Sequence, residues 1–213
     1  MQVRVLAVVA VLLLAGCGAD FCEQAVPAAE GSGGPAHLSI PVIGQRYSPG
    51  RASFPVSCVD VLVLDADDYA DTLATGRIRV RDGRVRVRNL PTRPVDVIVG
   101  GERFFPVKRT GVRLRSGRNR LGERLFMYRS DASFHASGWV DVEFRPGSTG
   151  EDIRSIYSVY DHVEVHDLGP SFRLRFTSES ALEADVRLQR LCRRLLASPH
   201  VRSARPVVDF NLM

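Results

Sequence analysis

The chain has 213 residues, of which 45% are hydrophobic, and this is enough for one or two folded domains. Its formal net charge at pH 7 is +5, from 29 basic and 24 acidic residues, and Lys108 is the only lysine. The acidic residues are mixed evenly among the arginines, which argues against a nucleic-acid-binding tail. We therefore expect a folded protein that has no nucleic-acid partner.

The first residues, MQVRVLAVVAVLLLAGCGAD, predict a bacterial export signal. Arg4 supplies the positive charge, and residues 5–14 form an apolar run that is too short to span a bilayer. The run ends in Leu-Ala-Gly-Cys17, which resembles the lipobox of bacterial lipoproteins. The resemblance implies that residues 1–16 are a signal peptide and that Cys17 is acylated and becomes the new N-terminus. An ordinary secretory signal with an incidental cysteine is the alternative.

The resemblance also implies a location. Stable anchoring needs more than one acyl chain, and a lipoprotein carries two or three. Gly18 follows the cysteine, which in lipoproteins favours the outer membrane. We therefore expect a lipid-anchored protein of the bacterial cell envelope. Residues 17–37 are rich in small residues, glycine and proline, so they are predicted to be a flexible tether.

Three cysteines remain after Cys17. Cys192 lies among leucines on a predicted helix, so we expect it to be a buried free thiol. Cys22 and Cys58 are then the candidates for a disulfide that joins the tether to the first domain. Two free thiols are the alternative.

Residues 38–130 contain short segments that alternate apolar and polar residues, with turn signals between them. This pattern predicts an all-β sandwich of the immunoglobulin or transthyretin kind. The clearest segments are VDVLVLD (59–65), RIRVRDGRVRVRN (77–89), VDVIVGG (95–101) and GVRLRSG (111–117).

The segment at 77–89 predicts a tight β-hairpin, because Asp82-Gly83 is a two-residue turn signal. The register that follows places arginine opposite arginine, and apolar residues opposite each other on the second face. Opposed like charges are destabilising, so this face is a candidate for binding lipid phosphates or an acidic partner. A solvated face, with neighbouring carboxylates such as Asp60, Asp65 or Asp96, is the alternative. The candidate anion-binding residues are Arg77, Arg79, Arg81, Arg84, Arg86 and Arg88.

The segments DGRVRVRNLP (82–91) and VDVIVGGERFFPVKRTGVRLRSGRNRLGERL (95–125) resemble the carboxypeptidase regulatory-like, or transthyretin-like, sandwich family. They share with it a DG turn, an alternating strand, an LP corner and a closing strand after a glycine turn. The chain departs from the family at the corner, where residues 92–94 are Thr-Arg-Pro instead of a glycine and an aromatic residue. The resemblance implies a non-catalytic accessory or binding module.

From residue 137 to 213 the pattern changes to strand, helix, strand, strand, helix, strand. This order predicts an α+β domain with the ferredoxin-like (βαββαβ) fold, in which two helices cover one sheet face and the other face is open and polar. Ser148 or Thr149 is expected to cap the first helix, and a broad apolar side is expected on the second. The predicted strands are residues 139–145, 162–166, 171–176 and 201–210, and the second helix ends before Ser198-Pro199.

Three segments of this region resemble the prodomain of subtilisin-like proteases and its stand-alone peptidase-inhibitor relatives. The segments are VEFRPGSTGEDIRSIYS (142–158), LGPSFRLRF (168–176) and LEADVRLQRLCRRLLASPHVRSARP (182–206). The chain departs from the family after Arg205-Pro206, where Val207 replaces the usual asparagine.

This resemblance implies a partner. In the family, the open sheet face lies against the protease and the C-terminal tail enters the substrate cleft. The chain is therefore expected to bind a subtilisin-like protease as an inhibitor or folding helper, although reuse of the domain for another contact, or as a structural module, is the alternative. The sheet-face candidates are Trp139, Asp141, Glu143, His162, Glu164, His166, Arg173 and Arg175. The tail candidates are Phe210, Asn211, Leu212 and Met213.

Other chemistry finds little support in the sequence. His162, Glu164 and His166 lie on one strand face, but no further ligand is evident, so we expect a polar sheet face rather than a metal site. Motifs typical of a serine nucleophile, a phosphate-binding glycine loop or a zinc protease are lacking. We predict neither enzymatic activity nor a cofactor. Protease binding is the leading functional hypothesis, and binding of an anionic envelope surface through the arginine hairpin is the alternative.

Overall fold

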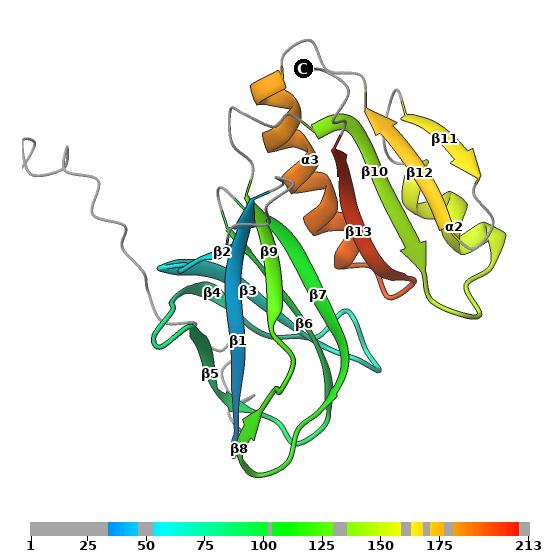
Figure 1. The fold of residues 1–213 in the computed structure, drawn as a ribbon. Coiled ribbons are helices and arrows are strands. Elements are labelled where there is room, and N and C mark those ends of the chain that lie inside the picture. The colour runs from blue at the N-terminus through cyan, green and yellow to red at the C-terminus, as the bar shows by residue number, and fades with distance from the viewer. Residues whose placement is uncertain are drawn as a thin grey trace, which may run out of the picture.

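The computed structural model describes residues 34–46, 53–101, 104–129, 136–158, 163–167, 171–176 and 181–208. Strands make up most of this part of the chain, and two helices accompany them (Figure 1). The predicted signal peptide, most of the predicted tether, His162 and the tail candidates lie outside the described residues.

A curled sheet of nine strands forms the N-terminal part. Its order is β2-β1-β9-β7-β6-β3-β4, and β5 and β8 pair with the first half of β1. β1 is long enough to join two groups of strands, because residues 36–41 pair with β5 and residues 42–46 pair with β9. The strands are β1 (Ala36–Arg46), β2 (Ser53–Phe54), β3 (Cys58–Asp65), β4 (Thr72–Arg79), β5 (Arg84–Leu90), β6 (Pro94–Gly101), β7 (Phe104–Arg113), β8 (Gly117–Arg120) and β9 (Leu125–Arg129).

The curl of this sheet encloses the first apolar core. Alternate residues of the strands point into it, as the period-two pattern predicts. The expectation of a mainly β N-terminal part is therefore confirmed. Fully buried members of this core include Leu38, Ile40, Val63, Leu73, Val85, Leu90, Val97 and Met127.

The turn of the predicted hairpin is present with its first predicted pair, Arg81 opposite Arg84, but the pairs predicted beyond it do not form. Asp82 and Gly83 have φ angles of 53° and 65°, and Arg81 and Arg84 exchange backbone hydrogen bonds of 3.0 and 2.9 Å across the turn. Beyond that pair the strands separate, because β4 pairs with β3 and β5 pairs with β1.

The separation has a physical reason. Ile78 of β4 and Val85 of β5 are both buried in the first core, which they enter from different edges of the curled sheet. A flat two-stranded ribbon would instead have placed like charges directly opposite each other. The turn therefore acts as a corner of the curled sheet.

The C-terminal part is a second, antiparallel sheet of four strands in the order β11-β12-β10-β13. Thr149 is the N-cap of the first helix, since its hydroxyl accepts from the amide of Asp152 at 3.2 Å and its amide donates back to the Asp152 carboxylate at 2.7 Å. The elements are β10 (Ala136–Phe144), α2 (Gly150–Tyr157), β11 (Val163–Asp167), β12 (Ser171–Phe176), α3 (Ala181–Leu196) and β13 (Val201–Val208).

Helix α3 lies between the two sheets (Figure 1) and contacts β10, β13 and β7. Its broad apolar side is buried in a second core, which contains residues from both sheets. A helix that covers two surfaces needs a wider apolar side than one that covers a single sheet, which explains the sequence pattern. The second core crosses the predicted domain boundary and includes Leu64, Ile98 and Phe105 from the first sheet, Val140 and Val142 from β10, and Leu188, Leu191, Cys192, Leu195 and Leu196 from α3.

The shared core predicts that the two parts unfold together. Ile98→Ala lies in the first sheet, and we expect it to lower the free energy of unfolding by about 2–5 kcal/mol. Trp139, the only tryptophan, is in β10 and therefore reports on the second sheet. Urea unfolding followed by Trp139 fluorescence and by far-UV circular dichroism should give one transition, shifted equally in both signals. A fluorescence transition that stays at the wild-type position would contradict the shared core, and the exposed Thr75→Ala serves as control.

Candidate functional site

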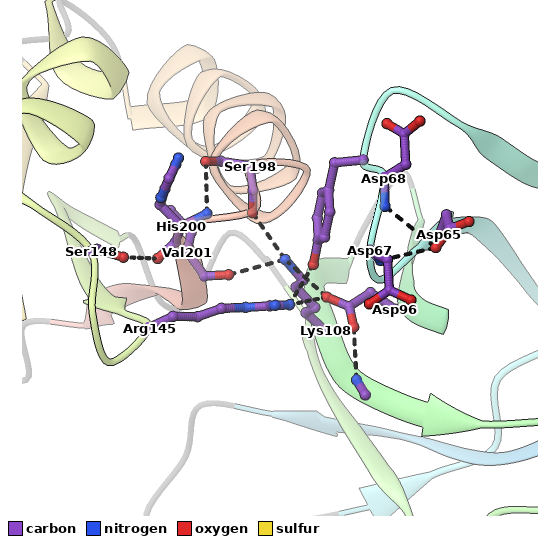
Figure 2. A network of polar contacts seen from close by, with 12 residues as sticks. Asp65, Asp67, Asp68, Asp96, Lys108, Arg145, Ser148, Ser198, His200 and Val201 are labelled. Carbon is purple, nitrogen blue, oxygen red and sulfur yellow. Dashed lines mark hydrogen bonds and ion pairs between the residues drawn. The ribbon is translucent and has the colours of Figure 1, made fainter. Parts of the chain in front are cut away.

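A polar cluster lies where the second sheet meets the first (Figure 2). We call Tyr69, Asp96, Lys108 and Arg145 the junction cluster. Asp96, on β6, is completely buried, and its carboxylate accepts from the Gly111 amide at 2.7 Å and lies 3.5 Å from the Lys108 Nζ. Arg145, which directly follows β10, donates to the same carboxylate. One buried anion of the first sheet thus holds a cation from each part of the protein.

Lys108 also contacts the C-terminal part directly. Its Nζ donates to the backbone carbonyl oxygens of Ser198 and Val201, at 3.1 and 3.0 Å. Both carbonyls lie between the end of α3 and the start of β13. The compact ammonium group can satisfy three acceptors around one point, which the planar guanidinium of arginine cannot do in the same way. This accounts for a lysine at this position in a chain whose other basic side chains are arginine.

Tyr69 completes the junction cluster from the loop between β3 and β4. The Lys108 Nζ lies 4.7 Å from the centre of the Tyr69 ring, and the Arg145 Cζ lies 5.4 Å from it. Arg145 also donates to the tyrosine hydroxyl. The ring therefore gives both cations a favourable cation–π contact in a site that buries the Lys108 side chain completely and most of the Arg145 side chain.

Burial lowers the pKa of Lys108 to about 8, with Arg145 adding to the decrease and Asp96 opposing it. Lysines with a lowered pKa act as nucleophiles or bases in many active sites. The Lys108 side chain has no exposed surface, however, and its nitrogen is held by backbone carbonyls. We therefore assign it to holding the junction rather than to chemistry on a substrate.

The sheet-face candidates on β10 lie together. Trp139, Asp141 and Glu143 alternate with Val140 and Val142, which are fully buried beneath α3, so the three lie on the opposite face of the strand. Glu143 accepts from Arg202 at 3.0 Å and from Ser203 at 3.1 Å.

The strand pairing brings the remaining sheet-face candidates into rows beside them. Arg175 pairs with Trp139 on one side and with Glu164 on the other, and Arg173 pairs in the same way with Asp141 and His166. The side chains of β11 and β12 lie outside the described part of the structure. Two residues of this face on β13, Ser203 and Arg205, were missed by sequence reasoning, although their period-two spacing could have identified them.

The predicted arginine face does not exist as one surface. Arg77 and Arg79 lie on β4, whereas Arg84, Arg86 and Arg88 lie on β5 at another edge of the curled sheet. The Arg84 Nε donates to the Ser39 hydroxyl at 2.8 Å, and its Nη2 donates to the carbonyl oxygens of Ser39 and Leu121, each at 3.1 Å. Arg86 forms an exposed ion pair with Asp82 at 3.3 Å.

Two of the four cysteines, Cys58 and Cys192, lie among the described residues. Cys58 takes part in a disulfide bond. Its predicted partner Cys22 and the predicted lipid attachment residue Cys17 lie outside the described residues. Cys192 is a free and fully buried thiol, as predicted, and burial raises its pKa to about 12.

Two further features are absent from the described ranges. Those residues contain no group of three or more His, Cys, Asp or Glu side chains that could hold a metal ion. They also contain no helix that is long and apolar enough to span a membrane.

Comparisons with known proteins give little guidance. No family model matches the chain, and no curated protein matches it. Among solved structures, the major pilin SpaA of Corynebacterium diphtheriae is weakly similar, with 10% sequence identity and a TM-score of 0.30. The match covers 70% of this chain and 55% of the pilin chain, so this chain spans about half of the pilin's length. A similarity at this level carries no conclusion about function.

Removing the charge of Asp96 tests the junction cluster. Asp96→Asn keeps the volume and an acceptor for Gly111, but it leaves Lys108 and Arg145 without their shared anion. Because breaking a buried ion pair leaves uncompensated charge, we expect the free energy of unfolding to fall by about 3–5 kcal/mol. Chemical denaturation measures this change. The matched control is Asp67→Asn on the exposed loop, and an Asp96→Asn effect no larger than this control would contradict the role of the cluster.

The lowered pKa of Lys108 predicts a pH dependence of stability. Between pH 8 and the ordinary lysine value of 10.5, the folded protein releases the Lys108 proton before the unfolded chain does. The free energy of unfolding of the wild type should therefore rise with pH in this window, relative to that of Lys108→Met. Cys192 acts in the opposite direction above pH 9.0, but it is present in both proteins and cancels in the difference. Urea unfolding at a series of pH values measures the free energy of unfolding of both proteins. If the wild-type value minus the Lys108→Met value stayed constant or fell between pH 8 and 10.5, the lowered pKa of Lys108 would be contradicted.

Proposed function

We propose that this chain is a non-catalytic lipoprotein of the bacterial cell envelope that binds a subtilisin-like protease, as an inhibitor or as a folding helper. In this proposal Cys17 carries the lipid anchor in the outer membrane, and the tether holds the folded part away from it. The observation that carries the proposal is the placement of the polar sheet face, which lies opposite α3 and the first sheet.

The fold supports this proposal. The element order from β10 to β13 is βαββαβ, and the sheet is antiparallel with β10 at its centre beside β12 and β13. We propose that residues 137–213 have the ferredoxin-like fold that the prodomain resemblance implies. We propose likewise that residues 38–130 are a transthyretin-like sandwich, which acts as an accessory module.

The packing of α3 decides which surface of the C-terminal part can receive a partner. The apolar side of α3 is occupied, because it is buried against β10 on one side and against β6 and β7 on the other. The face with Trp139, Asp141 and Glu143 is not used in this packing. In prodomains of the family it is this sheet face, rather than the helices, that contacts the protease.

The composition of this face suits an interface. Tryptophan and arginine are enriched among the residues that dominate binding energy, and polar residues surround them. Trp139 is half-buried, and Arg205 is exposed on the same face, where β13 pairs it with Asp141. The ion pair of Glu143 with Arg202 is solvent-exposed, so it costs little to rearrange when a partner binds.

The experiment is a titration of residues 18–213 against a subtilisin-like protease from the same cells. We expect saturable inhibition, which is lost when residues 209–213 are removed, a deletion that leaves β13 intact. We expect Trp139→Ala to weaken binding by about 30-fold or more, the effect typical of an interface hot spot. Phe126→Ala is the matched control, because Phe126 is an exposed large apolar residue on the first sheet.

The outcomes are separable. Binding that depends on Trp139 but does not inhibit the mature protease would favour the folding helper over the inhibitor. Absence of any binding, or an equal effect of Trp139→Ala and Phe126→Ala, would rule out the sheet face as the protease-binding surface.

A further inference from the structure

A cavity of about 510 Å³ opens on the outer side of the strands β5, β1 and β8. We call it the arginine groove. Its lining contains Arg84, Arg86 and Arg88 from β5, Arg118 and Arg120 from β8, and Ser39 from β1 between them. The two arginines of β8 were not singled out from the sequence. The structure places them beside β5, which is the second strand of the predicted hairpin.

The strand register explains the shape of the groove. Ser39 pairs with Arg86 of β5 on one side and with Arg120 of β8 on the other. Paired residues lie on the same face, so a small side chain separates two long cationic ones. Neighbouring strands are about 4.8 Å apart, which places the backbones of the two arginines about 10 Å from each other. Two guanidinium groups at this separation can close on a single tetrahedral anion from both sides.

The charges in the groove are only partly balanced. Arg84 is fixed by its hydrogen bonds to Ser39 and Leu121. Among the described residues, Arg88, Arg118 and Arg120 form no ion pair, and the groove lining includes no carboxylate. Several cations gathered in one concave surface raise the local concentration of anions. The groove is thus poised for a ligand that carries more than one negative charge.

The position of the groove points to the source of that ligand. Residues 17–37 are the predicted tether, and β1, which forms the floor of the groove, begins at Ala36. The groove therefore lies where the described part of the chain begins, at the end of the predicted tether. In Figure 1, β8 and the start of β1 lie at the lower end of the molecule, whereas the four-stranded sheet lies at the upper end.

We propose that the arginine groove binds the phosphate groups of anionic lipid headgroups in the membrane to which Cys17 is anchored. This inference rests on the proposed anchoring, but not on protease binding. Stable membrane attachment commonly combines an acyl anchor with a basic surface, and each basic residue near an anionic surface adds to the affinity. Headgroup binding would orient the molecule so that the polar sheet face is directed away from the membrane.

The test uses the chain without its acyl groups, residues 18–213, and vesicles of pure phosphatidylglycerol or pure phosphatidylcholine. We expect binding to the anionic vesicles only, weakening as salt is added. Arg86→Gln combined with Arg120→Gln should weaken it by about fivefold for each arginine, or about 25-fold in total. Arg79→Gln combined with Arg194→Gln removes the same charge from exposed positions outside the groove and should weaken it by less than about fivefold, the effect of one arginine at the surface.

Several results would overturn the inference. Equal losses in the two double variants would mean that net charge alone drives binding. Full competition by inorganic phosphate would identify a site for free anions, and tighter binding to duplex DNA than to vesicles would identify a nucleic-acid site. Absence of binding to the phosphatidylglycerol vesicles would also reject the groove as a headgroup site. The acylation of Cys17 is checked separately, from the mass of the mature protein, so a failed anchor and a failed groove give different results.

Discussion

The buried carboxylate of Asp96 constrains how the two parts of the protein can be arranged. A carboxylate in an apolar interior is costly unless hydrogen bonds and opposite charge compensate it. Here the compensation comes from Lys108 and Gly111 of the first sheet and from Arg145 of the second. The full set of partners exists only when α3 is packed against β7. The apolar surface of α3 thus supplies the stabilisation, and the junction cluster specifies one orientation.

A fixed junction separates two candidate binding surfaces. The polar sheet face with Trp139 lies opposite α3, whereas the arginine groove lies at the far end of the first sheet, where β1 begins (Figure 1). The end of the proposed tether, at the start of β1, lies beside the groove. A membrane on one side and a protein partner on the other would therefore be held apart by the length of the first sheet, and a mobile connection between the parts would not maintain this separation.

The sequence predicted the features that depend on local patterns. Alternation of apolar residues located the strands, and the cap candidates Ser148 and Thr149 marked the start of α2, because periodicity and capping act within a few residues. It did not predict where a strand goes after its turn. Asp82-Gly83 specifies a turn but leaves open whether β4 and β5 pair, and the burial of Ile78 and Val85 decided this. The contribution of β8 to the arginine groove, and the junction cluster, were missed because the residues come from elements that are far apart in the sequence. The single lysine was the one signal that could have indicated the second of these.

Native-state hydrogen exchange tests the shared junction most directly. If the two parts form one cooperative unit, the slowest amides of α3 and of β6 should exchange with the same opening free energy, equal to that of global unfolding. Asp96→Asn should then lower both values by the same amount. A contrary result would be that the amides of α3 and β13 exchange with a much smaller opening free energy than the amides of β6, and that Asp96→Asn changes neither of the two values.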